Sequence, residues 1–177
     1  MGIRTVRTEG DECLRKVCKP VKSVSLRTRI LIEDMFDTMY ESGGVGLAAP
    51  QIGVLKRIVV MDIDDNQHVL INPQILEVSG EQTGYEGCLS IPGKSGIVTR
   101  PDYVKVKALN ERGEEYVLEG EGLLARCICH ECDHLDGILY SDKAEGGLIN
   151  NEDLPEDEEE ELYEDAYEEF TEEEIHK

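Results

Sequence analysis

The residues best suited to chemistry lie in one short stretch, His130-Glu131-Cys132-Asp133-His134. This is an H-E-x-x-H pattern, which binds a metal ion when it lies on a helix. Residues four apart lie above one another on a helix face, so His130 and His134 can hold one ion with Glu131 beside them. Because a carboxylate in that place can transfer protons, the pattern predicts a metal-dependent hydrolase.

Two histidines leave a catalytic metal site one protein ligand short. The zinc-protease extension H-E-x-x-H-x-x-G-x-x-H has its glycine at Gly137, but Tyr140 stands in the place of the third histidine. A downstream glutamate is an alternative ligand, although those glutamates lie in a charge run that favours a solvated surface. Cys88 is the better candidate, because it lies in a glycine-containing turn and a thiolate binds Zn²⁺ or Fe²⁺ well. The alternative for Cys88 is a small buried hydrophobic residue.

Two helices are expected to position these residues. Apolar residues at three- and four-residue intervals predict an amphipathic helix over 27–42, which Gly43 and Gly44 end. A second helix is predicted from about Gly120, through the histidine motif, to Leu135, closing at Gly137.

Strands are expected between the two helices. Runs of β-branched residues and alternating patterns predict strands over 57–63, 68–71, 103–109 and 115–118, the last two forming a hairpin. The segment 84–96, which contains Cys88, is expected to be irregular. The sequence therefore predicts an α+β fold, in which antiparallel sheets pack around a central helix that carries the H-E-x-x-H motif.

The charge of the chain is concentrated at its end. The net charge is −21, and residues 152–177 hold 15 acidic residues against one lysine, so −14 lies in this tail and −7 in the rest. Leu162, Ala166 and Phe170 form an apolar stripe that predicts an acidic C-terminal helix, with an unfolded tail as the equal alternative. We expect a catalytic domain over 1–150 and an acidic, helical extension over 151–177.

The composition argues against several classes of protein. Nothing in the sequence resembles the clustered Lys and Arg of a nucleic-acid-binding domain, so no DNA partner is expected. No run approaches the ~18 apolar residues that cross a membrane. Residues 1–7 lack the apolar core of a secretory signal, so we expect a cytoplasmic protein without membrane contact. Six cysteines then fit free thiols or metal ligands better than a disulfide framework.

Three blocks of the sequence resemble, in order and spacing, the signature blocks of the peptide deformylase family. They are Gly44-Val45-Gly46-Leu47-Ala48-Ala49-Pro50-Gln51, Glu86-Gly87-Cys88-Leu89-Ser90 and His130-Glu131-Cys132-Asp133-His134. The resemblance extends from about Arg4 to about Ala144.

The resemblance implies removal of the formyl group from the N-terminal formyl-methionine of newly made proteins, with release of formate. It also implies that Cys88, His130 and His134 hold one divalent metal ion per chain. In this family the ion is natively Fe²⁺, and Zn²⁺ or Ni²⁺ can occupy the site. The partners are then N-formyl-methionyl nascent peptides, with the ribosome transiently near.

The resemblance further assigns the catalytic groups. Glu131 is implied as the general acid and base, and the Gln51 side chain and the Leu89 backbone N–H as the donors to the developing oxyanion. The formyl carbonyl carries only hydrogen, so a cramped entrance lined by glycines suits it, and the methionine side chain needs an apolar slot. The expected substrate-binding residues are Val45, Gly46, Gly87, Leu123 and Cys127.

The chain also departs from the family pattern. Cys129 and Cys132 lie off the His130–His134 face and are expected to pack in the core, with metal misbinding or oxidation as the alternative. In agreement with the family pattern, the resemblance implies that Glu86 and Arg100 pair across the site and steady the Cys88 loop. Some relatives dock on the ribosome through a basic C-terminal helix, but ribosomal RNA would repel this acidic tail, so we expect no docking through it.

Two other functions compete with the deformylase interpretation. The first is a zincin-type metallopeptidase, which Tyr140 and the lack of a downstream ligand weaken. The second is a non-catalytic metal-binding relative that uses the acidic tail for binding. Glu131 and Gln51 argue against it, because a structural metal site has no use for a general base or an oxyanion donor.

Overall fold

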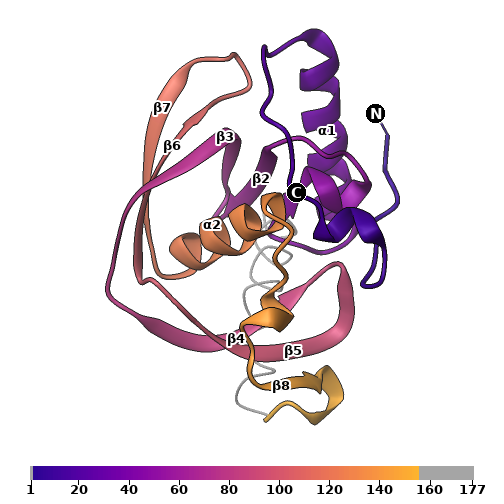
Figure 1. Ribbon diagram of the computed structural model, residues 1–177, viewed down its shortest axis with the longest axis vertical. Coiled ribbons are helices and arrows are strands. Elements are labelled where there is room, and N and C mark those ends of the chain that lie inside the picture. Colours follow the sequence, from indigo (N-terminus) through magenta and orange to yellow (C-terminus); the bar gives the residue numbers. More distant parts are fainter. Residues whose placement is uncertain (1, 156–177) are drawn as a thin grey trace, which may run out of the picture.

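A central helix, α2 (Gly122–Leu135), packs on one antiparallel sheet and also contacts a second (Figure 1). The computed structural model describes residues 2–155. This part confirms the predicted α+β fold and its central helix, whereas the expected acidic C-terminal helix lies outside the described residues.

The strands of the described part form two antiparallel sheets, and three of the six neighbouring strand pairs are hairpins. The larger sheet has the order β1-β2-β3-β6-β7, with strands Gly46–Ala48, Ile58–Ile63, Asn66–Ser79, Tyr103–Leu109 and Glu115–Glu121. The smaller sheet has the order β4-β5-β8, with strands Gln82–Cys88, Ile91–Arg100 and Glu145–Asn150. Short 3-10 helices lie at Glu12–Arg15, Ala49–Ile52, Tyr140–Asp142 and Asn151–Asp153.

The alternation predicted for β6 places one face of the larger sheet against α2. Val104, Val106 and Ala108 are buried in one hydrophobic core with Ala125 and Ile128 of the helix. The residues between them point outward, as predicted, because successive strand residues face opposite sides of a sheet. This packing fixes the position of α2 along its length.

Helix α1 (Leu26–Glu41) covers a second core. Ser25 caps its N-terminus through a reciprocal pair of hydrogen bonds with Thr28. Met35 and Met39 are fully buried in the core that contains Leu47. After Ser42 the chain turns at Gly43, whose φ of 71° is the left-handed conformation that glycine adopts without strain. The predicted end of this helix is therefore confirmed.

The segment 84–96 is not irregular, as we expected, but forms most of the β4–β5 hairpin. Cys88 pairs with Ile91, so only Leu89 and Ser90 separate the two strands. The prediction was wrong because four glycines interrupt the segment, and glycine carries no side chain from which alternation can be recognised. One of them is needed for packing: a Cβ at Gly96 would lie 2.8 Å from Ala144 Cβ and from Leu148 Cδ2.

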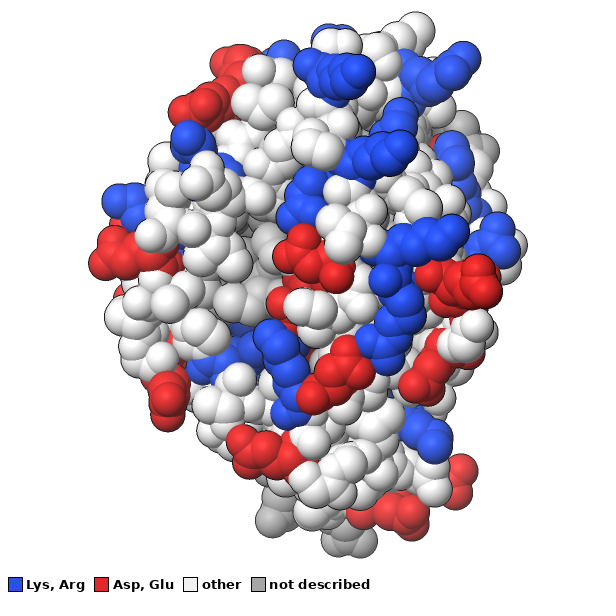
Figure 2. Space-filling model, viewed as in Figure 1, with Lys and Arg blue, Asp and Glu red and all other residues white. Residues whose placement is uncertain are grey.

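Basic side chains gather on one part of the surface (Figure 2). Figure 2 shows Lys and Arg side chains together on the upper right of this face, over the part of the molecule where the N-terminal segment and α1 lie in Figure 1.

All six cysteines are free thiols, in agreement with the prediction. In the described residues, no helix is long and apolar enough to span a membrane.

Candidate metal centre

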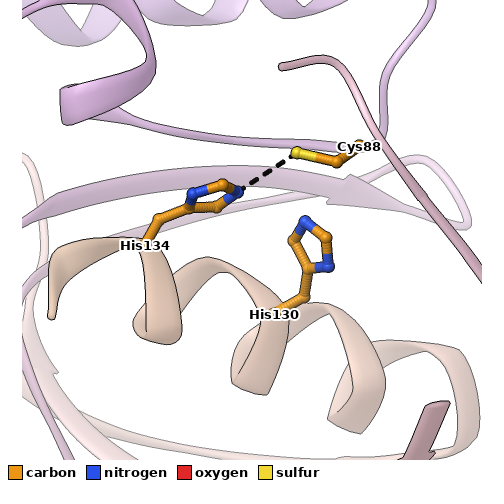
Figure 3. A group of neighbouring side chains, drawn as sticks. All are labelled: Cys88, His130 and His134. Atoms are coloured by element: carbon orange, nitrogen blue, oxygen red, sulfur yellow. Dashed lines mark hydrogen bonds between the residues drawn. The ribbon is translucent and has the colours of Figure 1, made fainter. Parts of the chain in front are cut away.

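Three side chains that could bind a metal ion meet between α2 and the end of β4 (Figure 3). His130 and His134 lie one turn apart on α2, and Cys88 is the last residue of β4. The Cys88 Sγ lies 3.4 Å from His134 Nε2, and one ligand atom from each residue lies within 4.8 Å of the others. Tetrahedral zinc holds nitrogen and sulfur roughly 3.6 Å apart, so the cluster fits one ion.

The donor types suit the ions that the resemblance implies. One thiolate and two imidazoles are soft or borderline ligands, which favour zinc or a late transition metal over Mg²⁺ or Ca²⁺. Burial lowers the pKa of His134 well below its usual value, so its imidazole is neutral, as a metal ligand must be. The sequence therefore predicted a set of three residues that the fold does bring together.

A buried carboxylate, Glu86, orients the first histidine. Its Oε1 lies 2.6 Å from His130 Nδ1, which leaves His130 Nε2 to face the metal position. Arg100 donates to both oxygens of Glu86, from Nη2 at 2.8 Å and from Nε at 3.0 Å. The predicted Glu86–Arg100 pair is thus confirmed. Burial alone would raise the pKa of Glu86, but hydrogen bonds with His130 and Arg100 hold it well below its ordinary value.

Two further partners of this network were missed from the sequence. Arg126 donates from Nη1 to Glu86 Oε2 at 2.6 Å, and Arg100 Nη1 donates to Asp133 Oδ2 at 2.7 Å. A signal for Arg126 was available, because it lies four residues before His130 and therefore on the same helix face. Tyr140, which replaces the third histidine of the protease motif, has its ring centroid 5.9 Å from that of His130.

Glu131 has the environment of a proton-transfer group. It is buried, and its Oε2 has no hydrogen-bond partner among residues 2–155. Burial raises its pKa to about 7, with attraction to His130 opposing and repulsion from Glu86 reinforcing the shift. A carboxyl group that titrates near neutral pH can both accept and return a proton.

The side-chain amide nitrogen of Gln51 points toward the turn that follows Cys88. Its Oε1 accepts a hydrogen bond from the Ala48 backbone N–H at 2.9 Å, which fixes the orientation of the amide. The Nε2 then donates to Ser90 Oγ at 3.1 Å and lies 3.6 Å from Cys88 Sγ. The Leu89 N–H, the other predicted donor, lies in the turn next to Cys88 and has no hydrogen-bond partner among residues 2–155.

These groups open into a cavity of about 600 Å³. Four of the five predicted substrate-binding residues line it: Val45, Gly46, Gly87 and Leu123. Cys127 is placed differently from the prediction, because it lies behind Gly46 in the first core, where its Sγ would be 2.9 Å from a Cβ at position 46. Cys129 and Cys132 are buried in the same core, so their predicted packing role is confirmed.

The cavity also has lining residues that the sequence did not indicate. Arg126 lines it from α2, and Asn151 and Leu154 line it from the end of the described chain. Asn151 comes just before the acidic run and Leu154 lies near its start. The acidic composition of this region did not indicate residues that line a cavity.

Comparison with known proteins gives one consistent result. A family model described as polypeptide deformylase matches residues 3–147. A peptide deformylase from Agathobacter rectalis is 61% identical over 148 residues, which cover 84% of this chain and 94% of that protein. A crystal structure of a peptide deformylase from Legionella pneumophila matches with a TM-score of 0.79 and 47% identity, over 82% of this chain and 88% of that one. The peptide deformylase from Thermotoga maritima matches with a TM-score of 0.80 and 42% identity, over 82% and 99% of the two chains.

Replacing Gly46 with alanine should displace the Glu131 carboxylate. A Cβ at this position would lie 2.6 Å from Glu131 Oε1, which is closer than any ordinary contact. We expect kcat/KM to fall roughly a hundredfold, since a small misplacement of a catalytic group has that effect, while bound metal is retained. Gly84→Ala is the matched control, because its Cβ would meet only Arg126 Nη2 at 3.7 Å. Full activity of Gly46→Ala would show that Glu131 has room to move.

Replacing Arg100 with alanine should weaken metal retention, because Glu86 and Asp133 both lose a buried partner. Removing one member of a buried ion pair also destabilises a fold by about 3 kcal/mol. Chelator competition and denaturant unfolding measure the two effects. Arg15→Ala is the control. The Arg15 and Asp142 side chains of this ion pair are 48% and 43% exposed, so the pair should contribute little to the free energy of unfolding. Unchanged metal content and turnover in Arg100→Ala would refute the supporting role of this network.

The buried Glu131 should make the metal-free protein less stable as pH rises. Its pKa is about 7 in the folded chain against 4.5 for the free group, so ionisation between these values favours unfolding. One pKa unit corresponds to about 1.4 kcal/mol, so Glu131→Gln should gain on the order of 3 kcal/mol over wild type at pH 8. This advantage should fade as pH falls toward 4.5. Thermal unfolding of both metal-free proteins across this range tests it, and parallel pH profiles would contradict it.

Proposed function

This chain belongs to the polypeptide deformylase family, and we propose that Cys88, His130 and His134 hold the metal ion on which its reaction depends. Members of the family are hydrolases that remove the N-formyl group from nascent peptides, and this is the function of the chain. The observation that carries the site assignment is the cluster of one thiolate and two imidazoles beside a buried Glu131, with His130 and Glu131 on the cavity wall.

We propose Fe²⁺ as the native ion, with Zn²⁺ or Ni²⁺ as possible replacements. A divalent ion at this site supplies a nucleophile from water near neutral pH and polarises a carbonyl oxygen. The thiolate of Cys88 and the two imidazoles suit all three ions. The fit of the donor set supports a metal of this class, and metal analysis has to identify it.

The remaining roles belong to residues of this chain. Glu131 accepts a proton from the attacking water and returns it to the leaving amine, which its raised pKa favours. Negative charge develops on the formyl oxygen as water adds. The Gln51 Nε2 and the Leu89 N–H, both beside Cys88, donate hydrogen bonds to that oxygen, and each such donor typically lowers the barrier by about 3 kcal/mol.

The cavity walls define the substrate. Gly46 and Gly87 leave room for the formyl end of the peptide, and Val45 and Leu123 offer apolar surface to the methionine side chain. The partners are therefore N-formyl-methionyl peptides as they emerge from the ribosome, and we propose a cytoplasmic location. The acidic tail does not dock on the ribosome in this proposal, because RNA would repel the 15 carboxylates of residues 152–177.

Two alternatives lead to different products or to none. A zincin-type peptidase would cleave internal peptide bonds, but its third ligand is missing, since Tyr140 stands in that place. A non-catalytic metal protein would bind metal without turnover. A buried carboxyl group whose pKa is about 7 argues against it, because a structural site gains nothing from such a group.

A formate-release assay on formyl-Met-Ala, run anaerobically with metal analysis of the same sample, tests the proposal. We expect formate release by the iron form, and loss of that activity in air as the metal and the Cys88 thiolate oxidise. The zinc form serves as the control, because Zn²⁺ undergoes no redox change. An iron form that keeps full activity through prolonged aeration without reductant would exclude the iron–thiolate site.

A second variant separates the competing functions in the same assay. Glu131→Gln should keep its metal and lose at least roughly a hundredfold in kcat, the usual contribution of a general acid or base. A Glu131→Gln variant that kept both its metal and its full function would favour the non-catalytic interpretation. Cleavage of an internal peptide bond by the wild type would favour the peptidase.

A further inference from the structure

One apolar side chain near the end of the described chain is buried without belonging to a core. Leu154 is only 7% exposed, although its neighbours Asp153 and Pro155 are both exposed. It is absent from all three hydrophobic cores of the described residues. Instead it lines the cavity that contains His130 and Glu131. Among the described residues, Leu154 therefore belongs to the wall of the cavity and to none of the three cores.

The segment that carries Leu154 is anchored to the smaller sheet. Strand β8 pairs with β5 at Lys94–Asn150 and Ser95–Ile149, which brings the following 3-10 helix against the same strand. The Ser95 hydroxyl donates to Asn151 Oδ1 at 2.7 Å, and Ser95 is itself buried. The Leu154 N–H then donates to the Asn151 carbonyl at 3.2 Å, which closes the turn.

The hydrogen bond between Ser95 and Asn151 places this segment close to the residues around Cys88. A Cβ on Gly87, one residue before Cys88, would lie 3.6 Å from the Lys94 carbonyl oxygen and 3.8 Å from Ser95 Oγ. Gly87, Ser95, Asn151 and Leu154 all line the cavity, so they form one continuous wall. We call these four residues the β5 wall. The cavity is also lined by residues 42–46 and, from α2, by Leu123.

We propose that Leu154 is a specificity-determining residue, which contacts the side chain that follows formyl-methionine and favours an apolar one there. The inference rests on the proposed function, because it places the formyl group at the metal ligands. A peptide bound there must continue along the cavity, and Leu154 presents apolar surface on the β5 wall. The charges near Leu154 do not favour a substrate side chain of either sign. Lys94 also lines the cavity, whereas the exposed Glu152 and Asp153 directly precede Leu154.

Substrate comparison with one variant tests the proposal. The full chain with Leu154→Ala is assayed on formyl-Met-Leu-Ser and on formyl-Met-Gly-Ser, next to wild type. We expect kcat/KM for the leucine peptide to fall roughly tenfold, mostly through KM, since a few methylene contacts discriminate substrates by that amount. The glycine peptide offers no side chain to lose, so its kcat/KM should stay within about twofold.

Leu148→Ala is the matched control. Leu148 lies on β8, six residues before Leu154, and packs on the third core rather than lining the cavity. It should leave the ratio of the two kcat/KM values unchanged, whatever its effect on stability. Asn151→Ala removes the hydrogen bond from Ser95 and should shift the ratio in the same direction as Leu154→Ala.

The outcomes separate this inference from its alternatives. An equal loss on both peptides would make Leu154 a structural anchor, and a gain on both would make it a plug that the substrate displaces; either overturns the proposal. No formate release by wild type from either peptide would instead contradict the proposed function. Formate release by wild type with an unchanged peptide ratio in Leu154→Ala would contradict the specificity role alone.

Discussion

The buried carboxylate of Glu86 is the group on which the site depends. It joins two strands and the central helix, because it lies on β4, accepts from Arg100 of β5, and contacts Arg126 and His130 of α2. Burying ions costs more free energy than one contact returns, so such a group persists only when every oxygen is satisfied. Both oxygens of Glu86 have two partners each. The network is best understood as a device that holds an imidazole in one orientation.

The same hairpin serves two purposes. Glu86 and Cys88 are two residues apart on β4, so the strand that supports His130 also carries the proposed sulfur ligand. The α2 helix carries the other two proposed ligands, and the larger sheet fixes α2 through Val104 and Val106. Each ligand is thus held by an element whose own position is set by buried contacts. A metal site built in this way requires little rearrangement when the ion binds.

The central part of the site could be predicted from the sequence because its signals are local. The H-E-x-x-H spacing and helix periodicity place His130 and His134 on one face, and β6 alternates clearly enough to reveal its buried side. The β4–β5 hairpin was missed, since its glycines hide the alternation, and β8 begins with Glu145-Gly146-Gly147, residues that are rare in strands. The contact of Arg126 with Glu86 could have been inferred from its spacing to His130. The place of Leu154 depends on tertiary packing, which a single sequence does not encode in any short pattern.

The position of Leu154 late in the chain determines when the cavity can form during synthesis. The proposed metal ligands lie at residues 88, 130 and 134, whereas the lining of the cavity within residues 2–155 extends to residue 154. A chain emerging from the ribosome therefore presents its ligand residues before it can close the pocket around a peptide. A product truncated just after β8 would keep all three ligands and still have an open side. The turn at residues 151–154 thus belongs to the catalytic body of the enzyme, although it contains the first residues of the acidic run.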